Sequence, residues 1–358
     1  MTPLARHLAA RIRAEGPISL SDYMAECLLN PQHGYYATRD PFGAAGDFTT
    51  APEISQMFGE LLGLSLAQSW LDQGAPSPCL LVEIGPGRGT LMADMLRAMR
   101  AVPGLLEATE VHLIEASPTL RACQRQTLVG RPVTWHDRID SLPEGPLFLV
   151  ANEFFDALPI RQFRREGQGW RERHVGLSGD GQLAPGFGPL TAYGMLAERL
   201  ADTPEGGIVE ICPALPPIAG EIARRIARHG GVALIADYGD WRSAGDTFQA
   251  LKAHAPADPY ADPGQADLTA HVDFEALSLA FRAGGAAASA MTPQGVVLSR
   301  LGIDARAERL ARALSGPALQ SHLAAHRRLT DPAEMGQLFK LIACHPAGMP
   351  PPPGLDPA

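Results

Sequence analysis

Three glycines at alternate positions follow a short apolar run and an acidic residue. The apolar run, residues 80–85, predicts a buried parallel strand, and a helix is predicted over residues 90–99. Glycines between a strand and a helix allow a tight turn and leave room for a ligand against the main chain. A turn without a ligand is the alternative, but it would sacrifice chain entropy for no gain in packing. The predicted ligand-binding residues of this turn are Glu83, Gly85, Gly87 and Gly89.

The spacing of these glycines distinguishes between two nucleotide cofactors. A nicotinamide dinucleotide site has the pattern Gly-x-Gly-x-x-Gly, whose third glycine would fall on Thr90 here. The pattern Gly-x-Gly-x-Gly with a preceding acid is typical of S-adenosyl-L-methionine, whose ammonium and sulfonium groups complement a carboxylate such as Glu83. We therefore predict this cofactor, with S-adenosyl-L-homocysteine as its product. The only lysines are Lys252 and Lys340, and neither lies in a phosphate-binding P-loop.

Acidic residues at the ends of the next two predicted strands extend the cofactor site. Glu115 ends a strand over residues 111–115, where a carboxylate can accept hydrogen bonds from both ribose hydroxyls. Asp137 follows a brief strand over residues 133–135 and can accept a hydrogen bond from an adenine amino group. A solvated strand end and a surface loop are the respective alternatives.

The fourth and fifth predicted strands, residues 147–151 and 232–236, also end in polar residues. In an open α/β sheet the ligand crevice lies at the carboxyl ends of the strands, so these residues are expected beside the reactive end of the cofactor. A helix start with a surface acid is the alternative for the fourth strand. The residues concerned are Asn152, Glu153 and Asp156 after the fourth strand, and Asp237 and Tyr238 after the fifth.

Asp47 and Thr50 belong to a loop that is too polar and glycine-rich for a core element. We expect both near the cofactor, and a cap on a helix from Glu53 is the alternative. No metal site is expected, because His322 and His326 share a helix face without the intervening glutamate of zinc proteases.

The composition indicates a globular chain of 358 residues with 46% hydrophobic and 19% charged residues. A net charge of −9 gives no general basic surface for nucleic acid. No apolar stretch approaches the roughly 20 residues that cross a bilayer, so membrane insertion is not expected. Five scattered cysteines without a Cys-x-x-Cys pair favour reduced thiols.

Strands and helices alternate from residue 79, which predicts an α/β fold with a doubly wound sheet. The expected sections are a helical section (1–78), the first half of the core (79–160), an inserted β-ribbon and helix (161–230), the second half of the core with a substrate loop at 240–270 (231–345), and a flexible tail (346–358).

Several longer segments resemble the MidA-like methyltransferase family, which includes a mitochondrial arginine methyltransferase that assists respiratory complex I assembly. The longest and most specific are Gly46–Glu60 and Asn152–Pro159; His33–Tyr36, Glu83–Met92, Ala236–Gly239 and Asp262–Phe274 also match. The resemblance implies a seven-stranded class I (Rossmann-like) methyltransferase sheet with an added N-terminal section. It also implies a protein arginine as acceptor, in a respiratory-chain subunit or its bacterial counterpart. The chain lacks the long targeting extension of the mitochondrial members, so a bacterial cytoplasmic enzyme is expected.

An arginine acceptor is protonated, and its guanidinium needs carboxylate partners that orient one nitrogen toward the methyl group. Glu153 and Asp156, with Asp237 and Tyr238, are therefore the candidate catalytic residues. Two other functions stay open at this point: a non-catalytic assembly chaperone that binds the cofactor, and a methyltransferase for small molecules. The oligomeric state is not predicted.

Overall fold

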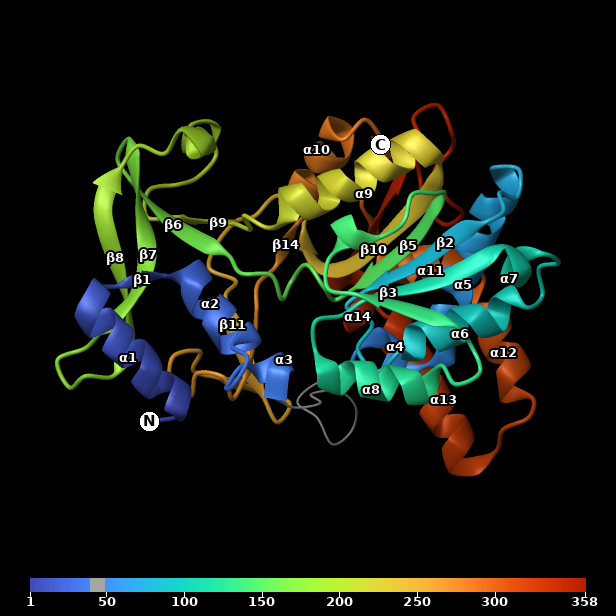
Figure 1. Ribbon diagram of the computed structural model, residues 1–358, viewed down its shortest axis with the longest axis horizontal. Coiled ribbons are helices and arrows are strands. Elements are labelled where there is room, and N and C mark those ends of the chain that lie inside the picture. The colour runs from blue at the N-terminus through green and yellow to red at the C-terminus, as the bar shows by residue number, and fades with distance from the viewer. Residues whose placement is uncertain (39–48) are drawn as a thin grey trace. The chain divides into compact units, whose positions relative to one another are not determined.

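The computed structural model describes residues 1–38 and 49–358 and divides the chain into two compact units (Figure 1). Each unit combines three separate stretches of sequence. The first unit contains residues 1–48, 156–215 and 242–273, and the second contains 49–155, 216–241 and 274–358. The expected helical section, residues 1–78, therefore contributes to both units.

The second unit is built on a large sheet whose strands run in the order β15-β17-β10-β5-β2-β3-β4, with β16 beside β17. Adjacent strands from β10 to β4 are parallel, whereas β17 is antiparallel to β10. The strands are β2 (Cys79–Ile84), β3 (Thr109–Ile114), β4 (Val133–His136), β5 (Leu147–Asn152), β10 (Gly231–Asp240), β15 (Ala287–Ala288), β16 (Thr292–Pro293) and β17 (Phe339–His345).

Helices cover both faces of this sheet, which explains why every residue of β2 and β5 is buried. One face packs against α5 and α6 through alternate residues such as Leu81, Phe148 and Val150. Figure 1 shows α9 and α10 on the opposite side. The helices are α4 (Ala51–Ile54), α5 (Gln56–Asp72), α6 (Thr90–Met99), α7 (Leu105–Ala108), α8 (Pro118–Thr127), α9 (Leu215–His229), α10 (Phe274–Ala283), α11 (Gln294–Arg300), α12 (Ile303–Ala311), α13 (Gly316–Thr330), α14 (Met335–Leu338) and the 3₁₀ turn η1 (Ile139–Ser141).

The first unit joins an N-terminal pair of helices to antiparallel strands, which include the β-ribbon expected after residue 160. Its larger sheet has the order β1-β7-β6-β9, with β8 on β7, and a smaller sheet has the order β12-β11-β13. The elements are α1 (Pro3–Glu15), β1 (Ile18–Ser19), α2 (Leu20–Leu29), α3 (Tyr35–Thr38), β6 (Arg161–Glu166), β7 (Gly169–Leu177), β8 (Leu183–Thr191), η2 (Gly194–Leu196), η3 (Glu198–Leu200), β9 (Ile208–Ile211), β11 (Gln249–Lys252), β12 (Ala255–Ala257), β13 (Asp267–Thr269) and β14 (Val272–Asp273).

Two segments differ from the sequence-based expectation. The loop predicted at 240–270 contains the strands of the smaller sheet, because short alternating runs there pair with each other. The C-terminal tail is anchored rather than frayed. Leu355 is buried in the main core, the Ser65 hydroxyl donates a hydrogen bond to the Pro353 carbonyl at 2.9 Å, and the Ala290 N–H donates to the Asp356 carbonyl at 2.8 Å.

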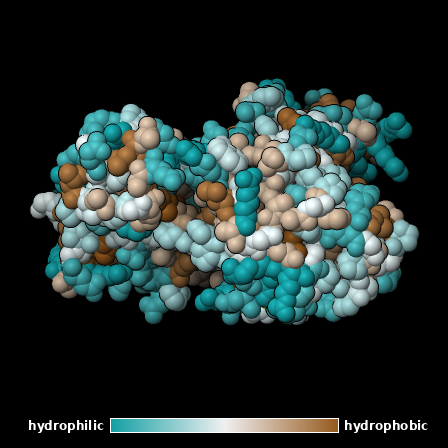
Figure 2. Space-filling view, turned by 90° about the horizontal axis from the view of Figure 1, so that it is seen from above, coloured by the Kyte–Doolittle hydropathy of each residue, from teal (hydrophilic) through white to brown (hydrophobic). Residues whose placement is uncertain are grey.

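The face in Figure 2 is mostly hydrophilic, with hydrophobic residues scattered over it, as is usual for a globular protein. Across residues 1–38 and 49–358, no helix is both long enough and apolar enough to span a membrane.

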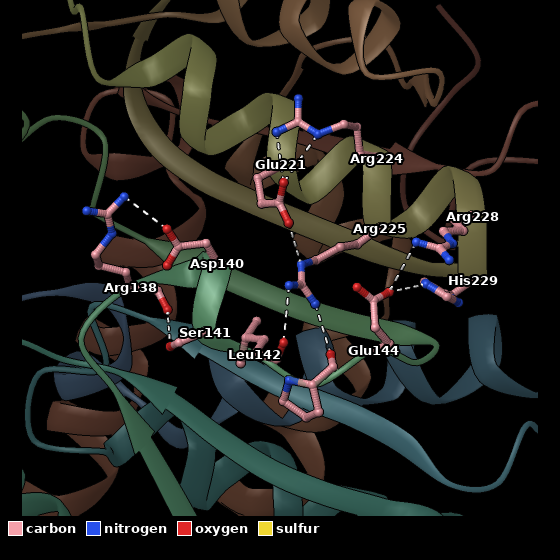
Figure 3. Close-up of polar contacts among 11 residues, drawn as sticks. Arg138, Asp140, Ser141, Leu142, Glu144, Glu221, Arg224, Arg225, Arg228 and His229 are labelled. Atoms are coloured by element: carbon pink, nitrogen blue, oxygen red, sulfur yellow. Dashed lines mark hydrogen bonds and ion pairs between the residues drawn. The ribbon is translucent and has the colours of Figure 1, made fainter.

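Arg225 fastens α9 to the segment that leads into β5 (Figure 3). Its guanidinium donates to the carbonyls of Pro143 at 2.9 Å and Leu142 at 3.1 Å, and its Nε donates to Glu221 at 2.8 Å. The Arg225 side chain is 8% exposed, whereas that of Arg224, on the same helix and also bonded to Glu221, is 61% exposed. Only Arg225 therefore satisfies carbonyls of another segment.

Arg225→Leu is expected to lower the free energy of unfolding by about 2–3 kcal/mol, because buried charged hydrogen bonds are lost and two carbonyls lose their donor. Urea denaturation measures the change. The matched control Arg224→Leu should stay within about 0.5 kcal/mol of the parent protein. Equal losses in the two variants would contradict this role of Arg225.

Candidate functional site

The parallel strands of the second unit bring the predicted site residues to one edge of the sheet. The ends of β2 and β5 are level, because Ile84 pairs with Ala151, and Ala236 of β10 pairs with Asn152 at the end of β5. Residues after these points therefore project from the same edge. Asp237 and Tyr238 are still within β10, which continues beyond the end of its neighbour β5.

The glycine turn after β2 has a backbone conformation that disfavours side chains. Gly85, Gly87 and Gly89 have φ angles of +66°, +50° and +84°, in the left-handed region. A Cβ atom at Gly85 would also lie 3.1 Å from the Phe154 ring. The turn therefore has the tight, glycine-dependent backbone that the sequence predicted.

Glu83 is a buried carboxylate with an unsatisfied oxygen. The residue is 2% exposed, and its Oε2 has no hydrogen-bond partner within the described part of the chain. Burial raises the pKa of Glu83 well above its ordinary value, the Met92 N–H hydrogen bond opposes this rise, and the nearby Glu115 and Asp94 carboxylates add to it. A cation beside Glu83 would remove this cost, since it stabilises the ionised form.

Glu115 follows β3, and donors from the backbone and from a side chain hold its carboxylate. Its Oε1 accepts from the Ser117 N–H at 2.7 Å, and its Oε2 accepts from Gln124 Nε2 at 3.2 Å. Burial is the main reason that the pKa of Glu115 is raised, and these hydrogen bonds oppose the rise. Because each carboxylate oxygen has two acceptor sites, further hydrogen bonds to a ligand are available.

Gln124 is the residue that the sequence reasoning missed. It belongs to α8 and is fully buried, and its Nε2 also donates to the Gly87 carbonyl at 2.7 Å. A signal was present, because Gln124 shares the apolar face of its helix with Leu120 and Leu128 at four-residue spacing. A polar residue on such a face usually has a buried partner.

Asp137 is exposed and paired with an arginine. Its Oδ1 accepts from Arg121 Nη2 at 2.5 Å, and the same guanidinium donates to the carbonyls of Glu115 and His136. Arg121 therefore ties together the chain segments that leave β3 and β4. The predicted adenine contact of Asp137 stays a prediction.

Asn152 and Glu153 form a short polar link after β5. Asn152 is buried, its Nδ2 donates to Glu153 Oε1 at 3.1 Å, and its Oδ1 lacks a partner among the described residues. Glu153 has a φ of +51°, which is unfavourable for a residue with a side chain. The Ala51 N–H also donates to Glu153 Oε1, at 3.3 Å, so this carboxylate contacts the start of α4.

Asp237 accepts hydrogen bonds from the segment after β5 and from its own strand, β10. It is fully buried, its Oδ2 accepts from the Phe155 N–H at 3.0 Å, and its Oδ1 accepts from the Tyr238 N–H at 2.9 Å. The Tyr238 ring packs edge-on against Phe339 at 5.4 Å between centroids. These contacts hold the backbone around Asp237 in place, and its catalytic role stays a prediction.

Thr50, Asp156 and Asp47 are the remaining predicted residues. Thr50 is buried at the N-cap position of α4, yet its side chain makes no capping hydrogen bond. Asp156 is buried in the first unit, where its carboxylate and that of Asp267 raise the pKa of Tyr36, after burial as the main cause. Asp47 lies outside the described residues.

Residues 61–292 match the family model described as "Putative S-adenosyl-L-methionine-dependent methyltransferase". A Xenopus laevis protein named "Protein arginine methyltransferase NDUFAF7, mitochondrial" is 39% identical, covering 96% of this chain and 84% of the relative. The chain belongs to the MidA-like methyltransferase family. The Homo sapiens protein of the same name is 37% identical, with 97% of this chain and 84% of the relative covered.

A solved structure of a Burkholderia thailandensis protein, with S-adenosyl-homocysteine bound, gives a TM-score of 0.85 at 31% identity. The match covers 98% of this chain and 94% of that protein. S-adenosyl-L-methionine is therefore the cofactor of this methyltransferase, as the glycine spacing predicted.

The residues of this MidA-like chain suit the cofactor chemically. The unsatisfied oxygens of Glu83 and Asn152 are acceptors for the donors of an amino-acid moiety, and Glu115 has acceptor sites for ribose hydroxyls. The acidic character around Glu83 favours a ligand with an ammonium and a sulfonium. The left-handed glycines provide the close backbone approach that this ligand needs.

Glu83→Gln is expected to stabilise the ligand-free protein at neutral pH while abolishing cofactor binding. The pKa of Glu83 is raised from 4.5 in the folded protein. At pH values above 4.5, ionisation of this buried carboxyl therefore costs folding free energy. The gain is about 1.4 kcal/mol for each unit of the raised pKa, and it should vanish at acid pH, where the carboxyl is protonated in both states.

Thermal unfolding of the two proteins from about pH 4 to about pH 8 measures this gain. Glu107→Gln is the control, because Glu107 is an exposed residue of α7 in the same unit and its substitution should change stability by no more than about 0.5 kcal/mol. A less stable Glu83→Gln protein at neutral pH would refute the cost assigned to the buried charge.

Proposed function

We propose that this chain transfers a methyl group from S-adenosyl-L-methionine to an arginine side chain of a partner protein. The observation that carries the proposal is the 39% identity, over 96% of the chain, to a protein named as a protein arginine methyltransferase. The acidic residues at the strand ends support it, because a protonated guanidinium requires carboxylate partners.

The cofactor supplies an electrophilic methyl group on its sulfonium, so the protein mainly orients the nucleophile and excludes water. Glu83 and Asn152 bind the amino-acid end of the cofactor, Glu115 binds the ribose, and the glycine turn supports both. Phe154 packs against Gly85 and excludes water from this side. Asp137, Thr50 and Asp47 complete the proposed cofactor-binding set.

Glu153 is the proposed partner of the acceptor guanidinium. Its Oε1 accepts hydrogen bonds from the Ala51 N–H and Asn152 Nδ2, and its backbone is held after β5 by the Glu153 N–H, which donates to the Ala236 carbonyl at 2.9 Å. A carboxylate held in this way can accept two parallel N–H bonds from a guanidinium. Asp156 follows three residues later, and Asp237 and Tyr238 hold the adjacent strand end.

We also infer that the large sheet of the second unit is the seven-stranded, doubly wound sheet of class I methyltransferases. The strand path β15-β17-β10-β5-β2-β3-β4, with an antiparallel β17, supports this assignment. Helices on both faces support it as well.

The partner we propose is a respiratory-chain subunit or its bacterial counterpart. The location we propose is the bacterial cytoplasm. The relatives support a protein substrate through the name they bear. The five cysteines are all unpaired, which is the usual state in a reducing compartment.

Glu153→Gln is expected to retain cofactor binding and lose methyl transfer. The amide cannot accept two charged hydrogen bonds, and the loss of about 2–3 kcal/mol corresponds to a roughly 30- to 150-fold lower turnover. The assay supplies methyl-tritiated S-adenosyl-L-methionine to lysate from cells that lack this chain, and follows label in protein and methylated arginine by mass spectrometry.

Glu144→Gln is the matched control, since this glutamate is in the same unit and its side chain is 61% exposed. Full turnover by Glu153→Gln would remove its catalytic role. Label confined to metabolites would replace the proposal with a small-molecule methyltransferase, and cofactor binding without any label would favour a non-catalytic chaperone.

A further inference from the structure

Gln124 connects the ends of three neighbouring strands. Its Nε2 donates to the Gly87 carbonyl in the turn after β2 at 2.7 Å and to Glu115 Oε2 after β3 at 3.2 Å. Its Oε1 accepts from the indole N–H of Trp135, in β4, at 2.8 Å. The side chain is fully buried, so no solvent competes for these contacts.

This set of contacts requires an amide. The Gly87 carbonyl and the Glu115 carboxylate both need a donor, whereas the Trp135 indole needs an acceptor. A glutamate at position 124 would place a second negative charge beside Glu115, and an apolar side chain would leave all three groups without this partner. The stem of Gln124 is a neighbour of the turn, since a Cβ placed at Gly89 would lie 3.5 Å from Gln124 Cγ.

The contacts fix the direction of the Glu115 carboxylate. One oxygen is held by the Ser117 N–H at 2.7 Å and the other by Gln124, so rotation of the carboxylate would break one of them. The acceptor sites that are left point away from these donors. Gln124 holds the turn of Gly87 at the same time, and therefore sets the position of the turn relative to the carboxylate.

We propose that Gln124 is a positioning residue for the cofactor ribose, acting through Glu115. This inference rests on the proposed ribose contact of Glu115. It assigns to α8 a role beyond covering the sheet, because the helix provides the group that couples the turn to the carboxylate.

Binding of two ligands to the full-length protein tests the proposal. Isothermal titration calorimetry compares S-adenosyl-L-homocysteine with its 2′,3′-dideoxy analogue, which lacks the ribose hydroxyls. Gln124→Met keeps the length and shape of the side chain and removes its hydrogen bonds. We expect this substitution to weaken binding of S-adenosyl-L-homocysteine roughly 10- to 100-fold. The loss of affinity for the dideoxy analogue should be smaller by a factor of at least about ten.

Gln294→Met is the matched control. Gln294 is also a fully buried amide of the second unit, and its Nε2 donates to the Leu329 carbonyl at 2.9 Å, away from the glycine turn. This variant should bind both ligands as the parent protein does. If Gln124→Met does not fold, Gln124→Asn, which keeps an uncharged amide but withdraws it from Glu115, is expected to show the same selective loss.

The outcomes separate this inference from the function on which it rests. Failure of the parent protein to bind S-adenosyl-L-homocysteine would overturn the cofactor site. Equal binding of the two ligands by the parent protein would overturn the ribose contact of Glu115. Discrimination by the parent protein, with equal losses for both ligands in the Gln124 variants, would overturn the positioning role alone.

Discussion

The buried carboxylate of Glu83 is the constraint around which the second unit is organised. An ionised group that is 2% exposed costs folding free energy unless a cation or several donors stabilise it. The protein supplies the Met92 N–H and leaves one oxygen unsatisfied within the described residues, while Glu115 and Asp94 make the surroundings more negative. The arrangement lowers the folding stability of the ligand-free protein. It also favours binding of a cationic ligand, which would stabilise the carboxylate.

The parallel sheet makes this concentration of charge possible. A strand buried on both faces can be almost entirely apolar, so its polar residues collect at its end, as in β2 and β5. Because the strands are level, carboxylates far apart in sequence become neighbours. Hydrogen bonds from the Ser117 N–H and Gln124 Nε2 then set the direction of the Glu115 carboxylate.

The sequence was informative at positions where a single physical requirement explains the residue type. Alternate glycines after an apolar run predicted the turn, and the acid two residues before the first glycine identified Glu83. The polar strand ends predicted Glu115 and Asn152 at the same edge. It was less informative for Gln124, whose importance depends on three contacts from separate elements. It also could not predict that Asp237 bonds the Phe155 and Tyr238 N–H groups, because that requires the register of β10 against β5.

Glu153 shows why such contacts matter for chemistry. A residue with a side chain at a φ of +51° is strained by about 1 kcal/mol or more, so the conformation persists only where the surroundings impose it. Here the Glu153 N–H is bonded to the Ala236 carbonyl, its carboxylate to Asn152 and the start of α4, and the Phe155 N–H to Asp237. The turn is thus held on both sides of the strained residue. In the proposed function, a carboxylate fixed in this way would not need to reorganise on binding the acceptor guanidinium, and such preorganisation favours methyl transfer.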